Sequence, residues 1–173
     1  YYLLGWVDQR ALLSSFSNPA LATLILLLLV SLALERSPLL DRLSDALLRG
    51  RPATATLRLS GCVVALSAFM NNTAVVGALL GMVTRQRLQP PSKLLIPLSY
   101  ASILGGITTL VGTSTNLVVN SFAVSAGLPA LEMFQFSIVG VPVAIACIIV
   151  LALTNRLLPA HPAGDGEARM PYF

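Results

Sequence analysis

Long apolar stretches, separated by short polar segments, set the pattern of the chain. The first, at 20–34, is almost wholly apolar and is followed by Glu35 and Arg36. These 15 residues would rise only about 22 Å as a helix, so the element needs a further turn at its ends to cross a hydrocarbon core of about 30 Å. We therefore expect a transmembrane helix over 20–36, and another over 134–158, which contains Pro142.

The segment 37–50 has a different pattern, because leucines recur at helical spacing while Asp, Arg and Ser fall between them. This alternation is typical of an amphipathic helix that lies at a membrane surface. We expect an interfacial helix over 37–50. A cytosolic linker helix is the alternative interpretation.

The apolar stretch 57–84 carries polar residues at its centre, namely Asn71, Asn72 and Thr73. A single spanning helix would place two adjacent asparagines near the membrane midplane, where unsatisfied polar groups are costly. The alternative is a re-entrant hairpin whose two short arms meet at the Asn-Asn-Thr turn. Close packing of the arms is expected from three glycines: Gly61, Gly77 and Gly81.

The stretch 94–126 is also interrupted, by the run Gly112-Thr113-Ser114-Thr115-Asn116. Apolar sequence resumes after this run, so the stretch predicts one discontinuous helix that is broken near the middle of the membrane. Glycine at position 112 is expected to provide a backbone geometry that other residues cannot adopt.

The composition supports a membrane protein. Among 173 residues, 55% are hydrophobic and only 10% are charged, whereas soluble domains carry about 25% charged residues. These values exclude a disordered chain, a disulfide scaffold and an ordinary cytosolic enzyme. The sequence shows no nucleophile–base pair or metal-ligand cluster, so no enzymatic activity is expected. The predicted class is an all-α polytopic membrane protein.

The placement of the basic residues distinguishes the two interpretations of 57–84. Basic residues flank the amphipathic segment and both ends of this stretch: Arg36, Arg42, Arg49, Arg51, Arg58, Arg85, Arg87 and Lys93. The segment 121–133 has no Lys or Arg. Because short basic loops remain in the cytoplasm, the pattern favours a hairpin that enters and leaves the membrane on the cytoplasmic side.

Two interrupted apolar stretches are typical of a transporter's binding site. Backbone carbonyls and Ser, Thr and Asn oxygens are neutral ligands suited to Na⁺, and helix N-termini favour anions. No acidic residue lies between Asp45 and Glu132, which disfavours proton coupling through a carboxylate there. The alternative is that the polar residues only pack helices, which would suffice for Ser99, Ser102, Thr108 and Thr109.

Three motifs carry a resemblance to a known family: SAFMNNTA at 67–74, PLSYASILGG at 97–106 and TLVGTSTNL at 109–117. Together they closely resemble the divalent anion:sodium symporters, which belong to the ion transporter superfamily with the citrate transporter-like domain. The resemblance covers about 20–159. The family's hairpin tip usually reads Ser-Asn-Thr, so Asn71 departs from it.

The resemblance implies roles for individual residues. The implied sodium ligands are Ser67, Asn71, Asn72 and Gly112. Asn72 and Thr73 would contact the anion. The residues that would line the site are Thr113, Ser114, Thr115 and Asn116. Position 71 contributes mainly its backbone carbonyl in the family. Na⁺ is the expected coupling ion, and no cofactor is expected.

The resemblance also implies the organisation of the whole transporter. Residues 1–159 would form the membrane domain, the first of two inverted repeats of an elevator-type symporter, and 160–173 a cytosolic tail. The expected partners are the second repeat of the same polypeptide, the lipid bilayer, a second copy in a homodimer and a small inorganic or carboxylate anion; no nucleic acid is expected. The expected location is the inner (plasma) membrane, in multi-pass form.

Three functions remain open at this stage. The first is Na⁺-coupled symport of a divalent anion, either sulfate or a di- or tricarboxylate. The second is an antiporter or arsenite-type exporter of the same superfamily. The third is a membrane fragment or scaffold that does not transport.

Overall fold

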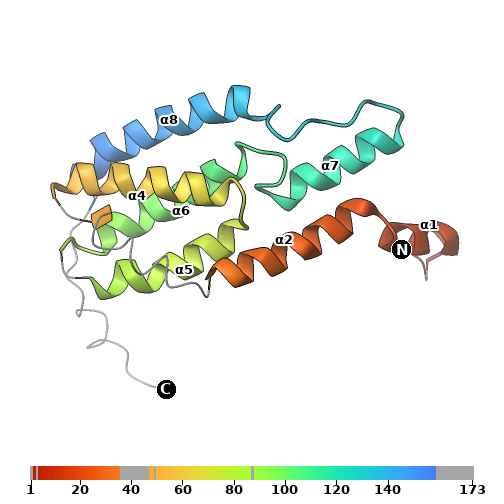
Figure 1. The fold of residues 1–173 in the computed structure, drawn as a ribbon, viewed down its shortest axis with the longest axis horizontal. Coiled ribbons are helices and arrows are strands. Elements are labelled where there is room, and N and C mark those ends of the chain that lie inside the picture. Colours follow the sequence, from red (N-terminus) through yellow and green to blue (C-terminus); the bar gives the residue numbers. More distant parts are fainter. Residues whose placement is uncertain (1, 3, 36–46, 49, 87, 159–173) are drawn as a thin grey trace, which may run out of the picture.

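The computed structural model describes residues 2, 4–35, 47–48, 50–86 and 88–158, and this part of the chain is helical without any strand (Figure 1). The predicted all-α class is therefore confirmed. Most of the expected interfacial helix at 37–50, and all of the expected tail at 160–173, lie outside the described residues.

The helices follow one another along the chain as α1 (Gln9–Phe16), α2 (Pro19–Glu35), α4 (Pro52–Ser67), α5 (Asn72–Arg85), α6 (Ser92–Gly106), α7 (Ser114–Ser125) and α8 (Ser137–Thr154), followed by the 3₁₀ turn η1 (Asn155–Leu157). In Figure 1, α4, α5, α6 and α8 lie side by side as a bundle, while α2 and α7 extend together toward α1.

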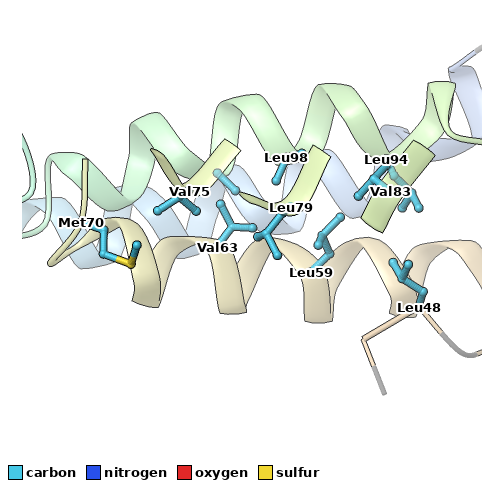
Figure 2. Close-up of a cluster of buried hydrophobic side chains, with 10 residues drawn as sticks. Leu48, Leu59, Val63, Met70, Val75, Leu79, Val83, Leu94 and Leu98 are labelled. Atoms are coloured by element: carbon cyan, nitrogen blue, oxygen red, sulfur yellow. The ribbon is translucent and has the colours of Figure 1, made fainter. Parts of the chain in front are cut away.

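Helices α4 and α5 form a helical hairpin that packs on α6. Valine and leucine side chains at spacings of three or four residues interlock between the three helices (Figure 2). The buried residues of this core are Leu48, Leu59, Val63, Met70, Val75, Leu79, Val83, Leu94, Leu98 and Ala101. At the open end of the hairpin, Gln89 Nε2 donates to the carbonyl oxygen of Gly50 at 2.9 Å. The two open ends of the hairpin therefore lie near each other.

The glycines expected to bring the hairpin arms together do not do so where the structure describes their surroundings. A Cβ added at Gly61 or Gly81 would meet no atom within 4 Å. The close approach is made instead by Gly105 of α6, whose added Cβ would lie 2.6 Å from the Val64 carbonyl oxygen. The tight helix contact is thus between α4 and α6, because only a residue without a side chain fits there.

The break between α6 and α7 is held by the start of α8. Ser137 Oγ donates to the Thr108 carbonyl oxygen at 2.6 Å, and the Leu110 N–H donates to the Met133 carbonyl at 2.9 Å. A Cβ at Gly140 would lie 2.5 Å from the Ile107 carbonyl oxygen, so α8 rests directly on the backbone of the break. These contacts satisfy backbone groups that have no partner within a helix.

Within the described residues, two segments are long and apolar enough to cross a membrane, Leu12–Val30 and Ser137–Thr154. Only 17% of the second is buried within the chain, and Ile138 and Leu153 of α8 are among its exposed side chains. Such an apolar face is stable only against lipid or another protein surface. The exposure pattern agrees with a helical membrane protein.

Candidate functional site

The hairpin tip and the helix break face the same cavity, which has a volume of about 250 Å³. One wall is apolar and comes from Leu24, Leu27 and Leu28 of α2. The other walls come from the tip and the break, through Phe69, Asn71, Asn72, Thr73, Val111, Gly112, Thr113 and Ser114. Two segments about 40 residues apart in the sequence therefore meet at one place.

Two helix N-termini border this cavity. Asn71 is the N-cap of α5, and its Oδ1 accepts a hydrogen bond from the Thr73 N–H at 2.9 Å. Thr113 is the N-cap of α7, with an extended backbone and no capping bond from its side chain. Neither helix carries an acidic residue in its first turn. The cavity therefore receives the positive ends of two helix dipoles, and none of the described residues that line it is acidic.

The side chain of Asn72, which lines the cavity, meets Ser67, which is not among the lining residues. Ser67 is fully buried, and its Oγ lies 2.6 Å from Asn72 Oδ1 and 2.7 Å from the Ser102 carbonyl oxygen. A serine hydroxyl carries one proton and can donate to only one of these acceptors at a time. The buried hydroxyl of Ser67 therefore links the start of α5 to α6.

A pair of glycines brings Asn72 and the break together. A Cβ at Gly106 would lie 2.8 Å from Asn72 Oδ1 and 3.2 Å from the Gly112 carbonyl oxygen. A Cβ at Gly112 would lie 2.7 Å from the Gly106 carbonyl oxygen. Gly112 does not have a positive φ, unlike Gly5, Gly50 and Gly127. The expectation of a special backbone geometry at Gly112 is thus wrong, and close approach of two backbones is the reason for glycine there.

The structure separates the other residues that the resemblance implies. Thr73, Thr113 and Ser114 line the cavity, whereas Thr115 and Asn116 are not among its lining residues. Asn116 instead donates from Nδ2 to the Thr109 carbonyl oxygen at 3.0 Å, which ties the first turn of α7 to the break. The Asn71 carbonyl accepts the first helical hydrogen bond of α5 from the Val75 N–H at 3.1 Å.

Three residues at this site were not among the site residues expected from the sequence, namely Ser102, Gly106 and Thr109; helix packing was the interpretation offered for Ser102 and Thr109. Ser102 presents its carbonyl to Ser67, and Gly106 makes room for Asn72. The Thr109 hydroxyl donates to the Ala68 carbonyl and accepts from the Gly112 N–H. All three lie within the motifs quoted above, but nothing in their residue type distinguishes them from packing residues.

Comparison with known proteins places the chain among transporters. The family model described as citrate transporter matches residues 2–166. An uncharacterized transporter of Synechocystis sp. is 35% identical, over 98% of this chain and 29% of the relative. A probable sodium/sulfate cotransporter of Chlamydomonas reinhardtii is 35% identical, over 86% of this chain and 18% of the relative. The uncharacterized transporter YfbS of Escherichia coli is 30% identical, over 99% of this chain and 30% of the relative.

The chain spans less than a third of the length of these curated relatives. The family match nevertheless extends over almost the whole chain, including the hairpin, the break and the cavity between them. Three relatives in Chlamydomonas reinhardtii are named as sodium/sulfate cotransporters, and a fourth is named as a putative sulfur deprivation response regulator. The chain belongs to the citrate transporter family of membrane transport proteins.

Proposed function

We propose that this chain is the first repeat of a Na⁺-coupled symporter for a divalent anion, and that the cavity between α2, α5 and α7 forms half of the anion site. The observation that carries the proposal is the meeting of two helix N-termini, neither with an acidic residue in its first turn, at one cavity. In this proposal the carrier couples anion uptake to Na⁺ and uses a second repeat.

The chemistry of the cavity suits an anion. Backbone N–H groups at helix N-termini bind oxyanions, and the helix dipoles favour negative charge. The side chains of Asn72 and Thr73 offer neutral donors at the α5 end, and Thr113 and Ser114 offer them at the α7 end. No acidic residue lies between Asp45 and Glu132 to repel the anion. Sulfate is the first candidate, because relatives are named as sodium/sulfate cotransporters.

The chemistry beside the cavity suits Na⁺. Ser67 Oγ, Asn72 Oδ1 and the Ser102 carbonyl converge, while one hydroxyl proton serves two acceptors. A cation bound to Asn72 Oδ1 would leave the Ser67 hydroxyl to donate to the Ser102 carbonyl alone. The carbonyls of Asn71 and Gly112 are the further ligands proposed here. All of these oxygens are neutral hard ligands, which suits a monovalent ion without a counter-charge in the site.

The remaining features of the proposal concern the whole carrier. A second, inverted repeat of the same polypeptide would supply the other half of the anion site. The hairpin and the broken helix would form part of the moving element of an elevator-type transporter in the inner (plasma) membrane. The carrier would act as a homodimer.

Uptake into proteoliposomes tests the proposed function. We expect the full-length carrier to accumulate radiolabelled sulfate under an inward Na⁺ gradient and to lose this uptake when choline replaces Na⁺. If succinate or citrate competes with sulfate for uptake, the substrate class would include carboxylates. Uptake that is independent of Na⁺, or that requires an outward counter-ion, would support the antiporter or exporter; absence of any flux would support a fragment or scaffold.

The hairpin is proposed to be re-entrant, with both open ends in the cytoplasm. The hydrogen bond between Gln89 and Gly50 keeps these ends close together, which supports entry and exit on one side. Single cysteines at Ala53 and Leu88, both exposed, are expected to react with a membrane-impermeant thiol reagent from the cytoplasmic side only. Labelling of the two positions from opposite sides would show that α4 and α5 together cross the membrane. A cysteine at the buried Ala55 serves as the unreactive control.

A further inference from the structure

The hydroxyl of Thr109 joins the two interrupted helices at the point where they form the site. It donates to the carbonyl oxygen of Ala68, which follows the last residue of α4. It also accepts from the N–H of Gly112 at 3.0 Å. One side chain therefore holds one backbone group from the hairpin tip and one from the break.

Both backbone groups depend on this hydroxyl because of where they lie. Ala68 and Gly112 are buried, so water does not readily replace a lost partner. The last carbonyls of a helix have no N–H donor within the helix, and the N–H of Gly112 lies outside the described helices. A hydroxyl that donates and accepts at once also strengthens both bonds by polarisation.

We propose that Thr109 is a positioning residue for Na⁺ coupling: it sets the separation between the two halves of the proposed sodium site without binding the ion. This inference rests on the proposed function. Its two partners adjoin the proposed ligands, since Ala68 follows Ser67 and the other partner is Gly112 itself. Thr109 makes a third contact, in which its carbonyl oxygen accepts a hydrogen bond from Asn116 Nδ2 at 3.0 Å. This bond connects the first turn of α7 to the same residue.

Thr108 offers a matched control. Thr108 and Thr109 are each 3% exposed, and both hydroxyls are hydrogen-bonded. The Thr108 hydroxyl, however, donates within its own turn to the Gly105 carbonyl at 2.7 Å. Replacing either threonine by valine keeps the shape and removes the hydroxyl. Only the change at Thr109 removes the hydrogen bonds that connect the hairpin tip to the break.

The test compares T109V, T109S and T108V in the full-length carrier. For T109V we expect the Na⁺ concentration for half-maximal sulfate uptake to rise about tenfold, with uptake at saturating Na⁺ affected less. T109S should restore the wild-type value, because serine keeps the hydroxyl. T108V should remain within about twofold of wild type. Unchanged Na⁺ activation in T109V, an equal defect in T108V, or failure of T109S to restore activation would overturn the proposal.

Hydrogen exchange separates failure of this inference from failure of the proposed function. In the full-length carrier, the peptide that contains 107–113 should exchange faster in T109V than in wild type or T108V, because the Gly112 N–H loses its acceptor. This measurement does not depend on transport. If wild type shows no Na⁺-dependent uptake, the proposed function fails, and unchanged exchange in T109V would then also reject the positioning role.

Discussion

Replacement of Gly112 by alanine is expected to raise the Na⁺ concentration for half-maximal uptake by about tenfold or more, equivalent to at least about 1.4 kcal/mol. An added Cβ would lie 2.7 Å from the Gly106 carbonyl oxygen and 3.0 Å from the Gly106 Cα. Both atoms belong to the backbone at the end of α6 and cannot rotate away. The break must therefore move, and the proposed carbonyl ligand of Gly112 moves with it.

Anion uptake is expected to fall together with Na⁺ activation in this variant, because the same shift displaces the wall next to Thr113 and Ser114. Gly112→Val should have a larger effect than Gly112→Ala, since it adds two further methyl groups. Gly61→Ala is the control: it lies in α4, where a Cβ meets nothing within 4 Å, and alanine favours a helix. Normal Na⁺ dependence of uptake in Gly112→Ala would show that the helix break does not contribute to the sodium site.

The second large effect is expected at Asn72, whose replacement by alanine should nearly abolish Na⁺-driven uptake at physiological Na⁺. The change removes the amide oxygen that lies 2.6 Å from Ser67 Oγ and the polar group beside Gly106. The Na⁺ requirement should rise by at least about tenfold. The measurement is sulfate uptake as a function of external Na⁺ in proteoliposomes.

Substitutions at Asn71 serve as the comparison for Asn72→Ala, because the Asn71 side chain has a different role. It caps α5 by accepting from the Thr73 N–H, and serine is also a favoured N-cap. Asn71→Ser should therefore be mild. Asn71→Ala should lose the cap, at a cost of about 1 kcal/mol in stability, and should affect Na⁺ activation less than Asn72→Ala. Equally severe losses in Asn71→Ser and Asn72→Ala would contradict the assignment of the ligand to Asn72.

The positions of the interruptions could be predicted from the chain alone. Polar runs inside long apolar stretches are local features, and they placed the breaks at Asn71-Asn72-Thr73 and at 112–116. In the structure the interruptions lie at 68–71 and 107–113, so they begin three and five residues earlier than predicted, and Asn72, Thr73 and 114–116 already belong to α5 and α7. The N-cap at Asn71 also follows a local rule, because asparagine is a favoured N-cap residue.

The neighbouring element that each side chain contacts could not be predicted from the sequence. Thr108 and Thr109 are adjacent, equally buried and identical in type, yet only Thr109 joins the hairpin to the break. Likewise, Gly61 was expected to be a packing glycine and meets open space, whereas Gly105 touches the backbone of α4. In an almost uniformly apolar helix, the pattern of side chains does not indicate which side meets a neighbour.

The apolar and polar pattern of this chain determines its helices and, to within about five residues, the two places where they stop, because these depend on neighbours along the sequence. The tertiary structure decides that the two stops meet, that Gly106 and Gly112 approach each other, and that Ser67 faces both Asn72 and Ser102. These contacts join residues up to 41 positions apart, as between Thr109 and Ala68. They arise from the angle and register at which α4, α5 and α6 pack, which only the complete set of core contacts specifies.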